Sequence, residues 1–511
     1  MYPAPIARER PGARAYVMAP SGASLTYAEL EARSNQVAHL LRERGIGPGG
    51  ALLLVLENRL EWPVLVAAGM RSGLYVTPVN WHLRSGELGP LLAEAVGDGV
   101  SCAIVTSARC ADVVAEALRE VGKPALLLSV DPGGEPEFLG DAVAGLPETP
   151  IDGELLGARV LYSGGSTGRP KAFRQQLLGV HPGDAPARHT GLAAKLELAA
   201  DTVFLSPAPN YHAAPFTFQL ITLSLGGTVV CLDRFDAEGS LAAIAAHGVT
   251  HSQWVPTMLL RLLRLSPEAR SRHDLSSHRV AFTSGAPCPP EVKAAVMDWW
   301  GPILHEYYGA SEGYGHTYVG PHDALAHPGT VGKPLSGSVH VTDDAGREVP
   351  AGTVGKVWFA PGGSAYRNAG DAGADLRSVG DLGRLDEDGF LYLVGREGHT
   401  IISGGVNVYP TEVEDTLLTH PAVADAAVIG LPDPEFGEGV TAVVELAGER
   451  AGNVSGAELI EYCRERLAGF KAPRRVEFVA SLPRLPTGKL NKTLLRDRIL
   501  SVDSGATGEG A

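Results

Sequence analysis

Short apolar runs of strand length alternate with helix-like segments through the first quarter of the chain. ALLLVLE at 51–57, SCAIVTS at 101–107 and PALLLSV at 124–130 match buried strands and are too short to cross a bilayer. Between the first two runs, EWPVLVAAGMRSG (61–73) has the pattern of a helix. Strands and helices in turn predict a parallel, doubly wound sheet in an α/β protein. A helix is also expected after Thr26, because TYAE (26–29) has the spacing of a capping box.

The size and charge of the chain narrow the classes of function. Its 511 residues correspond to about three or four structural units at roughly 100–200 residues per domain. A net charge of −15 argues against broad electrostatic binding of nucleic acid or of an anionic membrane. A single basic pocket for a phosphorylated ligand is still compatible with this charge. The five cysteines form no C-x-x-C pair and the first residues contain no signal-peptide core. We therefore expect a reduced, cytoplasmic protein.

The texture of the sequence changes near residue 331. GSVHVTDDAGREV (337–349), GTVGKVWFAP (352–361) and GRLDEDGFLYLVGR (383–396) predict short antiparallel strands, the first with a D-x-G turn at 344–346. After residue 396, helices and strands alternate over the length of a small α+β domain. We expect a large domain over 1–396, a small domain over 397–500 and a disordered tail over 501–511.

The stretch LYSGGSTGRPK (161–171) carries the most chemical information. Glycines let backbone N–H groups converge on phosphate oxygens, while hydroxyls and a lysine add donors and positive charge. No Walker A spacing fits. The segments 164–168 and 309–313 also match the G-x-S-x-G elbow of α/β-hydrolases, but no downstream Asp and His stand out to complete a triad. We interpret the stretch as a phosphate-binding loop in preference to a flexible turn.

Several further motifs follow this loop in a fixed order. They are PNYH (209–212), GAP (285–287), YYGASE (307–312), VGD (379–381), SGGVNVYPTEVE (403–414) and PRLPTGKLNK (483–492). In these motifs the chain resembles the adenylate-forming (ANL) superfamily over about residues 20–500, and within it the acyl-CoA and aryl-CoA ligase branch. The resemblance implies a large N-terminal domain of two doubly wound, mostly parallel sheets plus a distorted β-barrel. It also implies a small, mobile α+β C-terminal domain.

The resemblance assigns roles to individual residues. Lys489 would bridge the substrate carboxylate and the α-phosphate, Glu312 would bind Mg²⁺, and His212 would sit between the acyl pocket and the pantetheine tunnel. Tyr308 would stack on adenine, and Asp381 would accept both ribose hydroxyls. The full set implied to bind ATP, AMP as acyl-adenylate, or coenzyme A comprises Ser163, Gly164, Gly165, Ser166, Thr167, Gly168, Lys171, Gly285, Ala286, Pro287, Tyr307, Tyr308, Gly309, Ala310, Ser311, Asp381, Arg396, Ser403, Gly404 and Gly405.

The implied mechanism has two steps. A carboxylate attacks the α-phosphorus of ATP and releases pyrophosphate; a thiol then attacks the acyl-adenylate and releases AMP. Between the steps, the small domain would rotate near residues 396–399, removing Lys489 and admitting the segment 403–405.

Four departures from the family pattern bear on the first step. Gly164 replaces a serine, Ala172 a glycine and Val379 a threonine, and the hinge at 396–399 reads REGH. Losing one donor aimed at transition-state charge lowers a rate by roughly 10²–10³. A complete ligase is the preferred interpretation, but a non-adenylating variant fed by a partner ligase stays open. A non-catalytic acyl-nucleotide-binding protein and, on fold analogy alone, a luciferase-type oxygenase are further alternatives.

The motifs also constrain the substrate. No aspartate near PNYH is placed to hold an ammonium group, which disfavours an α-amino acid. Small residues around the motifs favour a roomy apolar pocket for a bulky aryl, alicyclic or polycyclic acid, in specialised natural-product metabolism; they include Ala213, Ala214, Gly285, Gly309 and Gly315. No carrier-protein domain follows the last motif, so coenzyme A is the expected thiol. We expect a monomer or homodimer.

Overall fold

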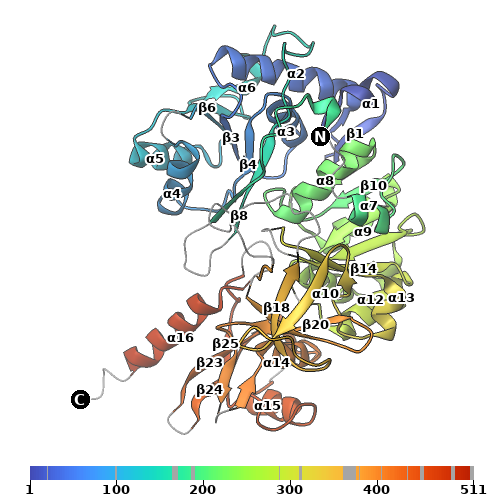
Figure 1. Ribbon diagram of the computed structural model, residues 1–511, viewed down its shortest axis with the longest axis vertical. Helices are drawn as coiled ribbons and strands as arrows, with labels where there is room; N and C mark the ends of the chain where they lie inside the picture. The colour runs from blue at the N-terminus through green and yellow to red at the C-terminus, as the bar shows by residue number, and fades with distance from the viewer. Residues whose placement is uncertain are drawn as a thin grey trace.

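The computed structural model shows three regions along the long axis of the molecule (Figure 1). A first sheet lies at one end, a larger second sheet in the middle, and a small C-terminal unit at the other end. The structure describes residues 1–19, 21–97, 100–163, 171–185, 190–286, 288–309, 313–360, 376–378, 380–403, 406–433, 436–448, 454–484 and 490–506.

The first sheet is doubly wound, as the alternation of strands and helices predicts. Its order is β7-β6-β5-β3-β4-β8-β9, and every neighbouring pair is parallel except β8–β9. Leu52 and Leu54 of β3 pack with helices on one face, whereas Leu53 packs with helices on the other, so the strand is buried on both sides. The elements are β3 (Ala51–Val55), α3 (Glu61–Arg71), β4 (Tyr75–Pro78), α4 (Ser85–Ala95), β5 (Cys102–Thr106), α5 (Ala111–Val121), β6 (Leu126–Ser129), β7 (Glu137–Phe138), α6 (Leu139–Ala142), β8 (Ala158–Ser163) and β9 (Lys171–Arg174).

The second sheet has nine strands in the order β16-β15-β14-β13-β12-β10-β11-β1-β2. The strands from β1 to β14 in this order pair in parallel, while β2, β15 and β16 are antiparallel additions at the edges. The elements are β1 (Arg14–Met18), β2 (Ser24–Thr26), β10 (Val203–Ser206), α8 (Ala213–Leu225), β11 (Thr228–Cys231), α9 (Ala237–His247), β12 (His251–Trp254), α10 (Pro256–Leu263), α11 (Pro267–Ser271), β13 (Val280–Thr283), α12 (Pro290–Trp300), β14 (Leu304–Gly309), β15 (His316–Val319), α13 (Pro321–Ala326) and β16 (Lys333–Pro334).

The two sheets share one apolar core, to which the N-terminal segment contributes. Phe204 and Phe282 of the second sheet belong to the same buried cluster as Leu52 of the first. Helix α2 (Tyr27–Glu43) begins with the expected capping box, in which the side chains of Thr26 and Glu29 each accept from the other's backbone N–H. Three short helices complete this part of the chain: α1 (Ala4–Glu9), α7 (Thr190–Lys195) and the 3₁₀ helix η1 (Pro182–Asp184).

The expected distorted β-barrel is wrong for the part of the chain that the structure describes. In its place lies an open antiparallel sheet in the order β17-β18-β19-β20, whose outer strands β17 and β20 are not paired with each other over their described residues. The strands are β17 (Ser338–Thr342), β18 (Gly355–Ala360), β19 (Asp381–Leu385) and β20 (Leu391–Arg396). The antiparallel pairing itself is as predicted.

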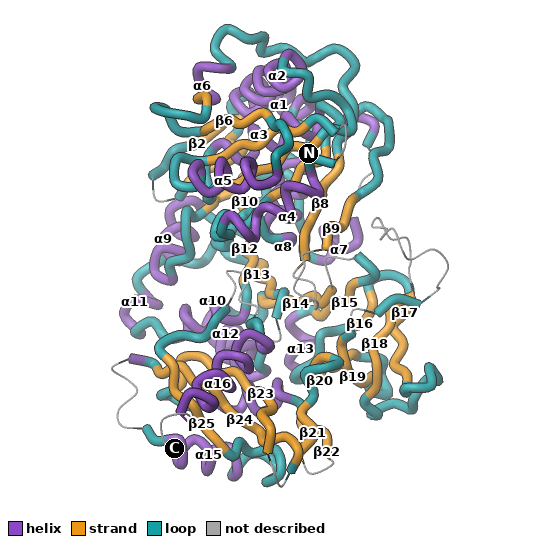
Figure 2. Tube along the Cα trace, turned by 90° about the vertical axis from the view of Figure 1, so that its left-hand side faces the viewer, coloured by secondary structure: helices purple, strands orange, loops and turns teal. Residues whose placement is uncertain are grey.

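The C-terminal unit combines a mixed sheet with the helices α14, α15 and α16, and is seen at the lower end of the molecule in Figure 2. Its order is β22-β21-β24-β23, with β25 parallel to β24. Helix α16 continues to Ala506, so the expectation of a disordered tail from residue 501 is wrong for 501–506, and 507–511 lie outside the described residues. No helix in the described ranges is long and apolar enough to cross a membrane. The elements are β21 (Ile401–Ser403), β22 (Val406–Val408), α14 (Pro410–Leu418), β23 (Val423–Asp433), β24 (Gly437–Leu446), α15 (Gly456–Arg464), β25 (Arg475–Val479) and α16 (Lys492–Ala506).

Candidate active site

The carboxyl ends of β13 and β14 place two of the sequence motifs side by side. The strands are parallel, with Thr283 opposite Glu306, so the turn after β13 lies beside the last residues of β14. Ligands of open parallel sheets bind at this edge. Gly285 has φ +88°, a left-handed conformation that a side chain would strain, so the turn requires glycine here.

A carboxylate joins three strands at this edge. Asp381, only 6% exposed, opens β19 and lies opposite Arg396, the last residue of β20. Arg396 Nε donates to Asp381 Oδ1 at 2.7 Å, and the Tyr308 hydroxyl donates to Oδ2. The structure therefore brings together three of the residues predicted to hold the nucleoside. A carboxylate has about four acceptor positions, so Asp381 can accept hydroxyls of a vicinal diol while keeping Arg396.

The two tyrosines of β14 take different surroundings, as alternation along a strand requires. Tyr308 packs beside Phe359, with ring centroids 5.8 Å apart. Tyr307 packs against Phe218 and Phe282 in the core between the sheets. Burial raises the pKa of Tyr307 to about 12, against a weaker lowering by its hydrogen bond with Ser284. Tyr307 was predicted to contact the nucleotide, but it is not brought to Asp381.

A buried polar network holds the turn that ends at His212. Asn210 N–H donates to the Asn58 side-chain oxygen at 2.7 Å, and Asn58 Nδ2 donates to the carbonyls of Ala208 and Leu232. Gln219 Nε2 donates to Asn210 Oδ1 at 2.6 Å. His212 then precedes α8, with its ring 4.2 Å from that of Tyr211.

Sequence reasoning missed Asn58 and Gln219. Asn58 had one signal that could have found it, since it is a polar residue directly after the buried run 51–57, where strand ends meet a site. Gln219 lies within an apolar helix, and only the fold reveals its partner.

Other predicted residues are described in part or not at all. Ser163 ends β8 and Lys171 begins β9, and the two are paired in register, but their side chains are outside the described residues. Ser403 is buried in the C-terminal sheet, where it pairs with Val406 and Gly437, and that sheet is separate from the one that holds Asp381. Gly285 and Ala286 are described, and Gly309 ends β14. The remaining predicted residues lie outside the described ranges: Gly164, Gly165, Ser166, Thr167, Gly168, Pro287, Ala310, Ser311, Glu312, Gly404, Gly405 and Lys489.

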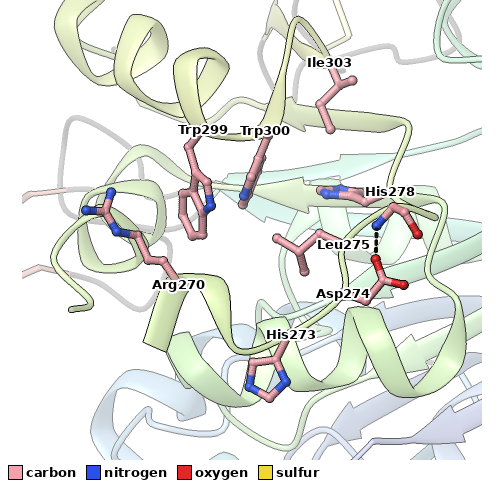
Figure 3. Close-up of a pocket in the computed structure, with 9 residues that line it drawn as sticks. Arg270, His273, Asp274, Leu275, His278, Trp299, Trp300 and Ile303 are labelled. Carbon is pink, nitrogen blue, oxygen red and sulfur yellow. Dashed lines mark hydrogen bonds between the residues drawn. The ribbon is translucent and has the colours of Figure 1, made fainter. Parts of the chain in front are cut away.

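A surface cavity of about 330 Å³ lies at the opposite end of the same strands (Figure 3). Trp299 and Trp300 project into it from the end of α12, and His278 and Ile303 line it just before β13 and β14 begin. It therefore belongs to the amino edge of the sheet and not to the candidate active site. Within the described residues, no group of three or more His, Cys, Asp or Glu could hold a metal ion.

Family models match most of the chain. The model of the AMP-binding enzyme matches residues 5–365, and that of the AMP-binding enzyme C-terminal domain matches residues 412–489. The chain belongs to the AMP-binding enzyme family. Within the adenylate-forming enzymes the chain belongs to the acyl-CoA ligase branch. It is therefore an enzyme of the ligase class, as the motifs predict.

Relatives of this AMP-binding enzyme are similar over nearly their whole length. A feruloyl-CoA synthase from Amycolatopsis sp. is 34% identical over 97% of this chain and 98% of its own. The long-chain-fatty-acid–CoA ligase FadD13 of Mycobacterium tuberculosis is 30% identical over 96% of both chains. The structure of o-succinylbenzoate CoA synthetase (MenE) from Bacillus subtilis with its acyl-adenylate intermediate is 27% identical, covers 97% of both chains and has a TM-score of 0.80. Acyl-CoA ligases of this family use ATP and coenzyme A, which fits the carboxylate at the edge of the sheet.

Proposed function

We propose that this enzyme converts a bulky hydrophobic carboxylic acid to its coenzyme A thioester through an acyl-adenylate, in the cytoplasm. The observation that carries the proposal is the Tyr308–Asp381–Arg396 cluster at the carboxyl edge of the second sheet. Its acceptor oxygens suit the ribose of ATP and AMP, and Tyr308 offers a ring beside them. All five cysteines are buried and carry no disulfide, in keeping with a reduced compartment.

An aryl, alicyclic or polycyclic acid in specialised metabolism is the substrate class that we propose. Ala213 and Ala214 are half-buried at the start of α8, next to His212, and their small side chains favour a bulky acid there. Gly309 and Gly315 give weaker support than their size suggests, because a Cβ at either position would meet His316 or Phe359 within 2.5 Å. The feruloyl-CoA synthase relative acts on an aromatic acid by its name, whereas FadD13 is named for a long-chain fatty acid.

The proposed chemistry divides the work among groups of the chain. Asp381, with Arg396 behind it, would bind the ribose and fix the nucleotide; Lys489 and the loop 163–171 would stabilise charge on the phosphates, and Glu312 would hold Mg²⁺. A carboxylate oxygen of the acid bonds to the α-phosphorus as pyrophosphate leaves. The coenzyme A sulfur then bonds to the acyl carbon as AMP leaves, and the thiol proton passes to water or a base. His212 and the segment 403–405 would guide the thiol.

A second candidate function is thioester formation from an acyl-adenylate supplied by a partner ligase. It is favoured by Gly164 and by the hinge, where Gly398 has φ +83° and supplies conformational freedom but no charge. The Tyr308–Asp381–Arg396 cluster is compatible with both candidate functions, because each of them binds an adenosine nucleotide.

Two parallel feeds separate these candidates. One contains ATP, Mg²⁺, coenzyme A and a panel of aryl, alicyclic and fatty acids; the other contains the matching preformed acyl-adenylates and coenzyme A. We expect mass spectrometry to detect thioester from both feeds, most strongly for a bulky acid. Thioester from the adenylate feed alone would establish the second candidate. Binding of acyl-adenylate with no thioester from either feed would mean a non-catalytic binding protein.

A further inference from the structure

The small C-terminal unit contacts the large one along a seam formed by α14, β23 and the helices α10 and α12. Leu418, at the end of α14, packs both in the core of its own unit and against the large-domain cluster that contains Leu259 and Val292. A cavity of about 430 Å³ opens in the same seam, between residues 260–264 and residues 418–421. Apolar packing along the seam is therefore incomplete, and polar contacts across it carry more weight.

Arg264, directly after α10, makes such a polar contact. Its Nη1 donates to the carbonyl of Ala424 at 2.8 Å and its Nη2 to the carbonyl of Val423 at 2.5 Å. Both acceptors lie on β23, so the planar guanidinium grips one strand of the small unit with two donors at once.

Asp415 lies three residues before Leu418 on α14, so it shares the helix face on which Leu418 packs against the large domain. The groups that act on its carboxyl are Glu414 on its own helix, Glu291 and Lys293 on α12, and Glu306 on β14. Cys288, before α12, also lies within electrostatic range. Burial, with the repulsion of Glu414, raises the pKa of Asp415 to about 8, against a lowering by Lys293.

In this orientation the first residue of α16, Lys492, lies close to the hinge residue His399, which follows Arg396 in the chain. Lys492 lies near His399, whose pKa is lowered by burial and then by the charges of Lys492 and Arg396, while Asp381 is near enough to oppose them. The hairpin β21–β22, in contrast, leaves Ile402 55% exposed and Val406 44% exposed. Lys492, the last residue of the motif that contains Lys489, thus lies toward Asp381, whereas the segment 403–405 is flanked by the solvent-exposed residues Ile402 and Val406.

We propose that Arg264 is a positioning residue that latches the small unit in the orientation for acid activation. This inference rests on the proposed two-step function, and it extends that function to a residue outside every motif. When the latch opens, the carbonyls of Val423 and Ala424 are released to water and the unit is free to turn.

The latch can be tested without turnover, by measuring a distance between spin labels on Glu116→Cys and Glu461→Cys, two exposed positions on α5 and α15. In the otherwise wild-type chain we expect one dominant distance. Arg264→Ala should raise the population of other distances about tenfold. Arg264→Lys keeps the charge but not the two parallel donors, so its population of other distances should lie between those of the wild type and Arg264→Ala. Arg261→Ala, on the exposed face of the same helix, is the matched control and should change nothing.

Half-reactions give the direction of the effect. With ferulic acid as probe, Arg264→Ala should slow pyrophosphate release about tenfold and leave thioester formation from feruloyl-adenylate equal or faster. An unchanged distance distribution in Arg264→Ala, or equal loss of both half-reactions, would overturn the latch. Wild-type enzyme that releases no pyrophosphate with any acid would overturn the two-step proposal instead, and the distance measurement would still decide on the latch.

The seam should also respond to pH through Asp415. Its carboxyl is neutral while the small unit is latched and ionises when the seam opens. The latched orientation is therefore fully favoured only below the pKa of an exposed aspartate. It weakens as the pH rises toward the pKa of about 8 that Asp415 has in the closed seam. We expect the ratio of latched to open orientations to fall between pH 6 and 8, by up to about tenfold per pH unit, and Asp415→Asn to abolish this dependence. An equal pH dependence in Asp415→Asn would contradict the assignment of this group.

Discussion

Replacing Asp381 by asparagine is expected to lower kcat/KM for ATP about 100-fold. The carboxylate is buried, and its two oxygens are already oriented by Arg396 and Tyr308 for an incoming diol. Hydrogen bonds to a charged acceptor are worth about 1.5–3 kcal/mol each, so weakening two of them removes roughly 3 kcal/mol of binding. An amide of the same shape keeps one acceptor and turns a donor toward the Arg396 side.

Calorimetric titration with ATP measures this loss independently of turnover. Asp388→Asn, at an exposed position in the turn between β19 and β20, is the matched control and should bind like the wild type. Tyr308→Phe should weaken binding by less than tenfold, because it keeps the ring and removes one hydroxyl. An ATP affinity in Asp381→Asn within twofold of wild type would exclude this carboxylate from the nucleotide site.

Replacing Lys293 by methionine is expected to destabilise the large domain by about 3–5 kcal/mol. Lys293 Nζ donates to Glu306 Oε2 at 2.6 Å and to the Thr330 carbonyl at 3.1 Å, and both charged residues are at most 4% exposed. Burial raises the pKa of Glu306, against a lowering by Lys293. Removing the lysine leaves a buried carboxyl without its counter-ion, which is the costly outcome.

A double-mutant cycle separates the interaction between Lys293 and Glu306 from the effect of each substitution alone. The variant with both Lys293→Met and Glu306→Leu should regain most of the lost stability, since two apolar residues need no charge partner. Urea unfolding followed by tryptophan fluorescence reports on this domain, because all six tryptophans lie within residues 1–396. Additive losses in the double variant would mean that the two residues do not act as a pair.

Local patterns in the sequence predicted the elements that local physics determines. Thr26 and Glu29 form their capping box because both partners lie within one turn. The apolar run at 51–57 becomes a strand buried on both faces, and parallel strands then bring the motif after β13 next to the motif in β14. The joint order of the motifs therefore predicted which segments meet at one edge of the second sheet.

Contacts between distant segments escaped the same reasoning. Whether β17 pairs with β20 depends on the path of the chain between them, and no turn signal in either strand decides it. Asn58 meets Asn210, and Arg264 meets Val423, across about 150 residues or more of intervening chain. Each looks like an ordinary polar residue at the end of an element until the fold supplies its partner.

Main-chain acceptors give the Arg264 contact an unequal tolerance to evolutionary change. Carbonyl oxygens are present whatever side chains β23 carries, so the small unit can drift in sequence, or be exchanged for that of a relative, and still offer both acceptors. The large domain has no such freedom, because two parallel donors at this position require arginine. In chimeras that join the large domain of this enzyme to the small domains of relatives, the contact should still form, because the large domain supplies Arg264. In the reverse chimeras it should be lost.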